Sequence, residues 1–489
     1  MKQLHFDTPI LDLGANGYDK LTLRDCLTNT LIMGGTGSGK TSTSLKYLLK
    51  RYIELGFGGV LISSKASDTS MYREWIKQVD TKNGTNRLDD VVIFNESSGS
   101  FRPLEYAISQ GESSEDIFNL TNLLFTIYQL DRSINGMSSG GSKDPFWDNS
   151  LRRLLNSMLL LFQLAEEEVT FSNLYELLIS LPSQEDYERL AEILNVKSDL
   201  QQLNEWGKNN YFISLLYKST FAVSLNINNA QRSRYDEYLL MKSFFLEDQR
   251  RLPDKTKFIV FSMLHNILSP FQSGILKKSC ATNPTNIKPE MCNEGKIIII
   301  DFSIKKYDAL SKLIGGIYKF QCMKTFEKRA FNIEVNRPAF LVVDEFHNYI
   351  HPYDSDFYST CRSSGVAVVN VTQNINGIYS KFSLQAKAKS LLANHGVRFL
   401  HSNIDFNTNE FFSNSIGREF KTVMNQSLNP TSTGVSLQNQ WHYKFAPSDF
   451  STLRNGGYQN NLMVDCITTI SGKTFSNKQN FLSHTFKQY

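Results

Sequence analysis

The sequence has few features that would connect it to a disulfide framework, a structural zinc ion or a lipid bilayer. Its six cysteines are scattered, with no CxxC pair and no cysteine–histidine set at zinc spacing. No run reaches the ~18 apolar residues of a membrane helix, and the longest candidate, at 154–165, is interrupted by Asn156 and Ser157. The N-terminal MKQLHFDTPI lacks the apolar region of a signal peptide. We therefore expect reduced thiols and a cytoplasmic chain without a transmembrane segment.

An excess of charge of one sign is also missing. The 489 residues include 52 Lys and Arg against 48 Asp and Glu, a net charge of +4. This bias is too weak to indicate or to exclude a nucleic-acid partner. Hydrophobic residues make up 41% of the chain, which argues against global disorder. The length predicts roughly two to four domains.

Apolar strand patterns alternate with helical ones in two parts of the chain. Strands are expected at 30–33, 59–64, 91–95, 296–302, 339–345, 366–373 and 397–402, with a helix at 41–55 after the first of them. Such alternation predicts a parallel sheet covered on both faces. Between about 105 and 290 the patterns are mostly helical, and SINGMSSGGSKD at 133–144 is loop-like in composition.

The expected fold class is therefore α/β, with a parallel-sheet nucleotide-binding domain and an inserted all-α domain. We divide the chain into 1–104 and 291–420 for the two parts of the nucleotide-binding domain, 105–290 for the insertion, and 421–489 for C-terminal strands and a tail. Within the tail, 461–470 is expected to be a last strand, 425–440 a loop and 475–489 an exposed end.

A phosphate-binding loop follows the first strand. MGGTGSGKTS matches G-x-x-x-x-G-K-[ST] in full, between a strand and a helix, and this context argues against a chance glycine-rich turn. Backbone N–H groups and the helix N-terminus would hold the phosphates. Lys40 is expected to reach the β- and γ-phosphates, and Thr41 to bind Mg²⁺. We assign ATP binding to Gly34, Gly35, Thr36, Gly37, Ser38, Gly39, Lys40, Thr41 and Ser42.

Two further strand ends carry candidate catalytic side chains. Asp344 and Glu345 close the apolar run LVVDE, where Asp344 would hold Mg²⁺ and Glu345 would orient and polarise the attacking water. Acidic pairs after strands are common, but together with the phosphate loop this one indicates an ATPase. Gln373 ends VVNVTQ and either senses the γ-phosphate or only caps a buried strand. His347 and His351 have metal-ligand spacing, yet Pro352 and the missing third ligand favour ordinary histidines.

The order of these motifs resembles the type IV secretion coupling proteins of the TraD/TraG family, in the FtsK/HerA branch of RecA-like motors. GGTGSGKTS and DEFHNYI are similar to the family's two nucleotide motifs, and CRSSGVAVVNVTQNINGI to its Arg-x-x-Gly strand ending in Gln. FRPLEY, DPFWDNSLRRLLNSMLLLF and LLANHGVRFLHSNIDFNTNEFFSNSIG resemble further family segments, so the likeness covers roughly 20–420. LISSKASD departs from the family's Asp-Pro-Lys-Gly, which leaves the role of Lys65 open.

The resemblance implies a DNA-pumping ATPase in which Arg362 acts as a finger on the neighbouring subunit's nucleotide. It also implies a homo-hexameric ring, DNA as a sequence-independent partner, and a relaxase or other protein cargo. Family members usually begin with a membrane segment, so this chain would need a separate membrane or channel partner at the inner membrane.

Three functions remain open at the level of sequence. The first is a conjugative motor that feeds DNA, or a DNA–protein complex, to a secretion channel. The second is a soluble HerA-like translocase in DNA processing, packaging or defence. The third is a protein-cargo adaptor with a weakly active nucleotide site, whose cargo the insertion at 105–290 would recognise.

Overall fold

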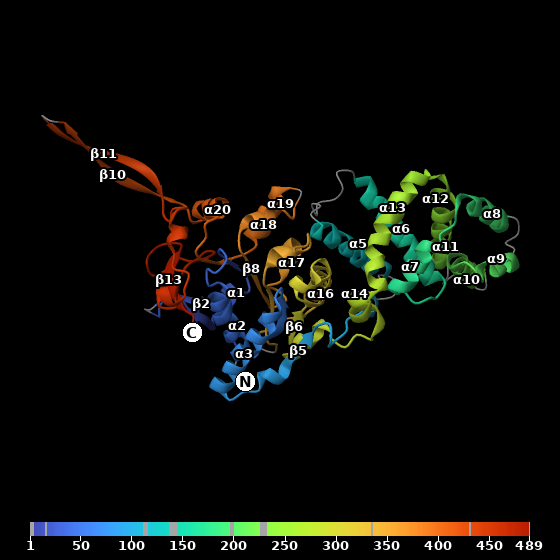
Figure 1. The fold of residues 1–489 in the computed structure, drawn as a ribbon, viewed down its shortest axis with the longest axis horizontal. Coiled ribbons are helices and arrows are strands. Elements are labelled where there is room, and N and C mark those ends of the chain that lie inside the picture. The colour runs from blue at the N-terminus through green and yellow to red at the C-terminus, as the bar shows by residue number, and fades with distance from the viewer. Residues whose placement is uncertain are drawn as a thin grey trace. The chain divides into compact units, whose positions relative to one another are not determined.

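Apolar runs rich in β-branched residues form one nine-stranded sheet (Figure 1). Its strands are β3 (Thr30–Met33), β4 (Gly58–Ser63), β5 (Val91–Phe94), β6 (Ile297–Asp301), β7 (Ala339–Val343), β8 (Val366–Thr372), β9 (Val397–Leu400), β12 (Met463–Ile470) and β13 (Leu482–Lys487). The order is β13-β12-β9-β3-β8-β7-β4-β6-β5. From β9 to β6 neighbouring strands are parallel, whereas β12 runs antiparallel to both β9 and β13. The seven strands expected between 30 and 402 are all present.

The computed structural model describes residues 4–14, 17–110, 116–135, 145–195, 200–224, 232–333, 336–382, 384–429 and 432–488. Most of the loop expected at 133–144 lies outside these residues. The chain divides into unit 1 (Met1–Ile93, Pro289–Lys306 and Cys322–Tyr489) and unit 2 (Phe94–Lys288 and Tyr307–Gln321).

Unit 1 contains the sheet and the helices that flank it. Its helices are α1 (Leu23–Cys26), α2 (Lys46–Glu54) after a π-helical turn (Thr41–Leu45), α3 (Ala66–Asn83), α17 (Asp354–Thr360), α18 (Ile375–Tyr379), α19 (Gln385–Ala393) and α20 (Phe406–Ile416). A short hairpin, β1 (Pro9–Asp12) with β2 (Lys20–Thr22), precedes α1. Every residue of β3, β4, β7 and β8 is buried, as expected for strands covered on both faces.

Unit 2 is helical, as the sequence between 105 and 290 predicts. It contains α4 (Pro103–Gln110), α5 (Asp116–Ile134), α6 (Pro145–Leu164), α7 (Phe171–Ile179), α8 (Gln184–Asn195), α9 (Leu200–Gly207), α10 (Tyr211–Ser224), α11 (Arg232–Ser243), α12 (Gln249–Arg251), α13 (Asp254–Leu268) and α14 (Gly274–Lys277). Leu151, Leu154, Leu155 and Met158 of α6 are buried on a helical repeat, which explains why this apolar run forms a core helix. The division between the units falls in α15 (Ile304–Tyr307) and in α16 (Ala309–Glu327).

The C-terminal segment differs from the sequence expectation in two places. Most of 425–440, expected to be a loop, belongs to the ribbon of β10 (Arg418–Asn429) and β11 (Ser432–Tyr443). The polar composition of this segment suggested a loop, but a two-stranded ribbon outside the main sheet does not need the apolar composition of a buried strand. The end expected to be exposed contains β13, an edge strand paired with β12. The last strand expected at 461–470 is β12.

All six cysteines are buried and unpaired. Among the described residues, no single helix has both the length and the apolar character needed to cross a membrane. One pair, Asp254–Gln272 with Gly274–Thr282, passes on length and composition but is bent by 73°.

Candidate nucleotide site

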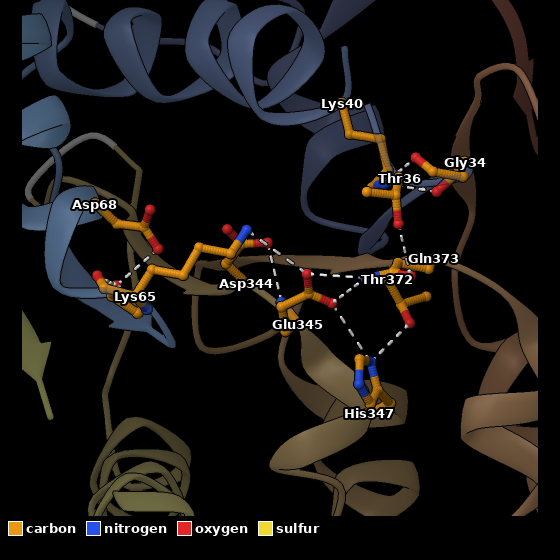
Figure 2. A network of polar contacts seen from close by, with 12 residues as sticks. Gly34, Thr36, Lys40, Lys65, Asp68, Asp344, Glu345, His347, Thr372 and Gln373 are labelled. Atoms are coloured by element: carbon orange, nitrogen blue, oxygen red, sulfur yellow. Dashed lines mark hydrogen bonds and ion pairs between the residues drawn. The ribbon is translucent and has the colours of Figure 1, made fainter. Parts of the chain in front are cut away.

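Four neighbouring strands bring the candidate residues to one edge of the sheet. In the order β3-β8-β7-β4, all parallel, the carboxyl ends lead into the phosphate loop, Gln373, the pair Asp344–Glu345, and Lys65. Parallel strands present their carboxyl ends on the same side, where open α/β sheets bind ligands. Figure 2 shows these side chains directed toward one another.

The phosphate loop has the backbone that its glycines allow. Gly37 and Gly39 have φ values of 75° and 87°, a region that strongly favours glycine. A Cβ on Gly34 would lie 2.6 Å from the Ser38 hydroxyl oxygen, so this position also needs glycine. The Lys40 ammonium donates to the carbonyl oxygens of Gly34 and Gly35 at 2.5 and 2.8 Å. Burial lowers the pKa of Lys40, and the nearby Glu345 and Asp344 oppose this effect.

Gln373 connects the phosphate loop to the acidic pair. Its side-chain oxygen accepts a hydrogen bond from the Thr36 hydroxyl at 3.2 Å. Its amide nitrogen donates to the two carboxylate oxygens of Glu345 at 3.2 and 3.4 Å. Asn403 donates from its side chain to the Gln373 backbone carbonyl at 2.9 Å. Gln373 is therefore part of a polar bridge across the site and not only a strand cap (Figure 2).

The Glu345 carboxylate is held by groups from three strand ends. Besides Gln373, the Lys65 ammonium lies 3.8 Å away and the His347 Nδ1 lies 3.6 Å away. The residue has φ 51° and ψ 50°, a left-handed conformation that is uncommon for a non-glycine residue. Strained backbone conformations of this kind cluster at functional sites. They persist only where contacts with the surrounding structure hold them in place.

Asp344 is the buried member of the acidic pair. It is 3% exposed, and one of its carboxylate oxygens accepts the Glu345 backbone N–H at 2.9 Å. Burial, together with the negative charges of Glu345 and Asp68, raises the pKa of Asp344 to about 6. A cation would relieve both effects, so this carboxylate and the half-buried Thr41 hydroxyl fit Mg²⁺. The oxygen ligands are of the hard type that Mg²⁺ prefers.

The part of the chain that the structure describes forms no complete metal site from side chains alone. Among the described residues, no group of three or more His, Cys, Asp and Glu is arranged to hold a metal ion. In proteins, Mg²⁺ is usually coordinated by one or two carboxylates together with water molecules and substrate phosphates. His351 is buried, and its Nδ1 accepts the backbone N–H of Tyr353, so it shapes a turn.

Arg362 is the one candidate that the structure does not bring to the others. It is exposed and precedes β8, at the amino-terminal end of that strand, whereas Gln373 follows its carboxyl end. Arg362 and Gln373 therefore lie at opposite ends of β8.

Two supporting histidines escaped the sequence reasoning. His347 was expected to be an ordinary histidine, yet it contacts Glu345 and lies 3.4 Å from the Thr372 hydroxyl. His401, after β9, is buried behind the loop, with its Nε2 2.7 Å from the Ser44 hydroxyl and its Nδ1 3.2 Å from the Asp465 carbonyl. Burial lowers the pKa of His401 to about 3, so its ring is neutral.

Comparisons with known proteins identify one matching family model and several structures of similar fold. Residues 338–448 match the family model described as the TraM recognition site of TraD and TraG. Among curated proteins, none matches the sequence. The fold resembles the bacterial conjugative coupling protein TrwBdeltaN70 in an unbound form, with a TM-score of 0.52, 14% identity, and coverage of 98% of this chain and 88% of that one.

Two nucleotide-bound structures of the plasmid coupling protein TrwB are similar as well. The complex with the non-hydrolysable ATP analogue ADPNP has a TM-score of 0.54 and 15% identity, over 95% of this chain and 87% of that one. The complex with ADP and Mg²⁺ has a TM-score of 0.50 and 13% identity, over 96% and 87%. The chain therefore shares its fold with the coupling protein TrwB, and its residues 338–448, from β7 to β11, match a family model of TraD and TraG.

Proposed function

We propose that this protein is an ATP-hydrolysing motor that moves DNA, or a DNA–protein complex, toward a type IV secretion channel during conjugation. The observation that carries the proposal is the bridge from Thr36 through Gln373 to Glu345. It connects a phosphate-binding loop to a candidate catalytic carboxylate, on a fold shared with coupling proteins. A merely structural nucleotide site has no need for this connection.

The phosphate loop binds the nucleotide. Backbone N–H groups of the loop surround the phosphates, and Lys40 moves from the Gly34 and Gly35 carbonyls to the β- and γ-phosphate oxygens. The exchange is favourable because phosphate oxygens carry full negative charge while carbonyls carry only a dipole.

The acidic pair divides two tasks between its members. Asp344 and Thr41 are positioned to hold Mg²⁺, which when bound neutralises charge on the phosphate oxygens. Glu345 accepts a proton from the water that attacks the γ-phosphorus, and the bond to the leaving ADP oxygen breaks in line. Gln373, Lys65 and His347 hold the Glu345 carboxylate in place for this step.

Gln373 also offers a route for coupling hydrolysis to movement. It contacts the loop and Glu345 by its side chain, and Asn403 after β9 by its backbone. Loss of the γ-phosphate changes what Thr36 and Glu345 contact, so β8 and the segment after β9 respond together. We propose that this response reaches neighbouring subunits of a hexameric ring, where Arg362 contacts the next subunit's nucleotide.

The family match supports a protein partner as well. Its description refers to recognition of TraM by TraD and TraG. We propose that residues 338–448 include part of the surface that contacts a DNA-processing protein such as a relaxase complex, and that a membrane or channel partner holds the chain at the cytoplasmic face of the inner membrane.

The test is the steady-state ATPase rate of the purified protein, measured with and without single- and double-stranded DNA at two salt concentrations. We expect Mg²⁺-dependent turnover that DNA stimulates and that higher salt diminishes, because phosphate contacts release counterions. Lys40→Ala should abolish it. Turnover that is indifferent to DNA would favour a protein-cargo adaptor, and absence of turnover would contradict the motor.

A further inference from the structure

The ribbon β10–β11 exposes large apolar side chains that the rest of unit 1 leaves uncovered. Phe420 is 59% exposed, Met424 63%, Leu437 68% and Trp441 65%. In Figure 1 the ribbon extends away from the neighbouring elements α20 and β13. An isolated two-stranded ribbon is marginally stable in water, and clustered exposed apolar side chains indicate a binding surface.

The register places these side chains on one face. Phe420 pairs with Trp441 and Met424 with Leu437, with the polar pair Thr422–Asn439 between them. Because side chains alternate between the two faces of a strand, positions 418, 420, 422 and 424 share one face with their partners 443, 441, 439 and 437. We call Arg418, Phe420, Met424, Leu437, Trp441 and Tyr443 the stacking face.

The charge on this face is positive. The Arg418 guanidinium lies 4.4 Å from the Tyr443 ring centroid and donates to the Tyr443 hydroxyl at 2.8 Å. Residues 418–444 contain one acidic residue, Glu419. It belongs to the opposite face, paired with Lys421 at 2.7 Å.

The aromatic rings leave surface for a ligand. The Phe420 and Trp441 centroids are 5.2 Å apart and their planes meet at 55°, so neither ring lies flat on the other. Planar rings beside an arginine are how proteins hold unpaired nucleic-acid strands, since every base has a stacking surface and every phosphate a negative charge.

We propose that the stacking face binds single-stranded nucleic acid, with bases stacked on Phe420 and Trp441 and a phosphate beside Arg418. The inference rests on the proposed function in taking DNA as the substrate, and deepens it by naming an unpaired strand and its contact site. Paired bases hide their faces inside the duplex, so duplex DNA should bind this face more weakly.

The experiment detects oligonucleotide binding by the fluorescence of Trp441. The full-length protein is titrated with oligo(dT) and with a blunt duplex while tryptophan fluorescence is recorded, because base stacking quenches an exposed indole. We expect saturable quenching by oligo(dT), little by the duplex, and loss of the signal in Trp441→Phe. Phe420→Trp in the Trp441→Phe background should restore it, since the new indole lies on the same face.

Affinity is measured separately by the anisotropy of labelled oligo(dT). Phe420→Ala with Trp441→Ala should weaken binding by roughly 30-fold or more, because the stacking of two bases is lost. Matched controls are Gln440→Ala on the opposite face and Tyr458→Ala, an 89% exposed aromatic outside the ribbon. Both controls should bind normally, and DNA-independent ATP hydrolysis should be unchanged in all variants.

The possible failures are distinguishable. One outcome would overturn this inference and leave the proposed motor intact. In that outcome, the double substitution does not change oligonucleotide affinity, and oligo(dT) does not quench the fluorescence of Trp441. A double variant that alters sedimentation but not DNA affinity would overturn it in favour of a contact between copies of the chain. If no variant and no wild-type protein binds any DNA, the DNA part of the proposed function fails with it.

Discussion

The Gln373 side-chain amide donates to both carboxylate oxygens of Glu345 at 3.2 and 3.4 Å, while its oxygen accepts from Thr36. This places one side chain between the phosphate loop and the candidate general base (Figure 2). The relationship exists because β8 lies between β3 and β7 in the sheet. A substitution at Thr36 should therefore affect the position of the Glu345 carboxylate, and a substitution at Glu345 should affect Thr36.

Glu345→Gln should separate nucleotide binding from hydrolysis. The amide keeps the size of the side chain but cannot take a proton from water, so turnover should fall roughly 10²- to 10⁴-fold. Nucleotide affinity should change by less than threefold, because Lys40 and the loop remain intact. Fluorescent-nucleotide titration and single-turnover hydrolysis measure the two effects. Equal loss of both would contradict the assignment of Glu345 as the base.

Gln373→Glu should lower turnover more than Gln373→Ala does. A second carboxylate at the position of the present amide repels the Glu345 carboxylate, whereas alanine only removes the hydrogen bonds to it. Single-turnover hydrolysis by the two variants and by the wild-type protein measures the difference. Equal rates in the two variants would mean that Gln373 does not act through Glu345.

Arg362→Ala should abolish ATP hydrolysis, and mixing this variant with a second inactive variant should restore part of the activity. Arg362 is exposed and precedes β8, at the end of that strand opposite Gln373, so any nucleotide that it contacts would belong to another subunit. Mixtures with Lys40→Ala subunits should regain part of the activity, since an intact arginine then faces an intact loop. Each variant alone is the inactive control. Absence of recovery at every mixing ratio would remove the finger assignment.

Asp344→Asn should stabilise the metal-free protein above pH 6. The pKa of Asp344 is raised to about 6 from an ordinary 3.8, so its folded state favours the protonated form. Wild-type stability should therefore fall as the pH rises from about 4 through 6, whereas the variant lacks this loss. The difference should reach about 3 kcal/mol at pH 8 and vanish near pH 4.

Thermal unfolding in EDTA between pH 4 and 8 measures this difference. Mg²⁺ with ATP should raise the melting temperature of the wild-type protein more than that of Asp344→Asn, because the variant has lost a negatively charged ligand. A variant that is less stable than wild type at every pH would show that the Asp344 carboxylate is stabilised in the folded state.

His401→Leu should weaken the support behind the phosphate loop. The substitution leaves the Ser44 hydroxyl and the Asp465 carbonyl without the ring nitrogens that now face them, at an expected cost of about 1–3 kcal/mol. Ser44→Ala should cost less in the His401→Leu background than alone. Urea unfolding of the four proteins in this cycle gives the coupling. Strictly additive effects would mean that the two side chains stabilise the loop independently.

The sequence predicted the strands of the sheet and the helical insertion because both depend on local pattern. Continuous apolar runs such as IIII at 297–300 and AFLVV at 339–343 are typical of strands in a sheet that is covered on both faces. The loop prediction for 425–440 was wrong for the opposite reason. This segment is mostly polar in composition, and composition alone does not distinguish a two-stranded ribbon from a loop.

The chemical groups at each strand end can be identified from the sequence: the glycines and Lys40 of the loop, the carboxylates of Asp344 and Glu345, and the amide of Gln373. They belong to the side chains and the local backbone of short motifs. Which of these groups lie in contact depends on the tertiary structure. The strand order placed β8 between the loop and the acidic pair, brought Lys65 and His347 to Glu345, and buried His401 behind the loop. Strand order depends on packing between segments far apart in the chain, and no local pattern encodes it.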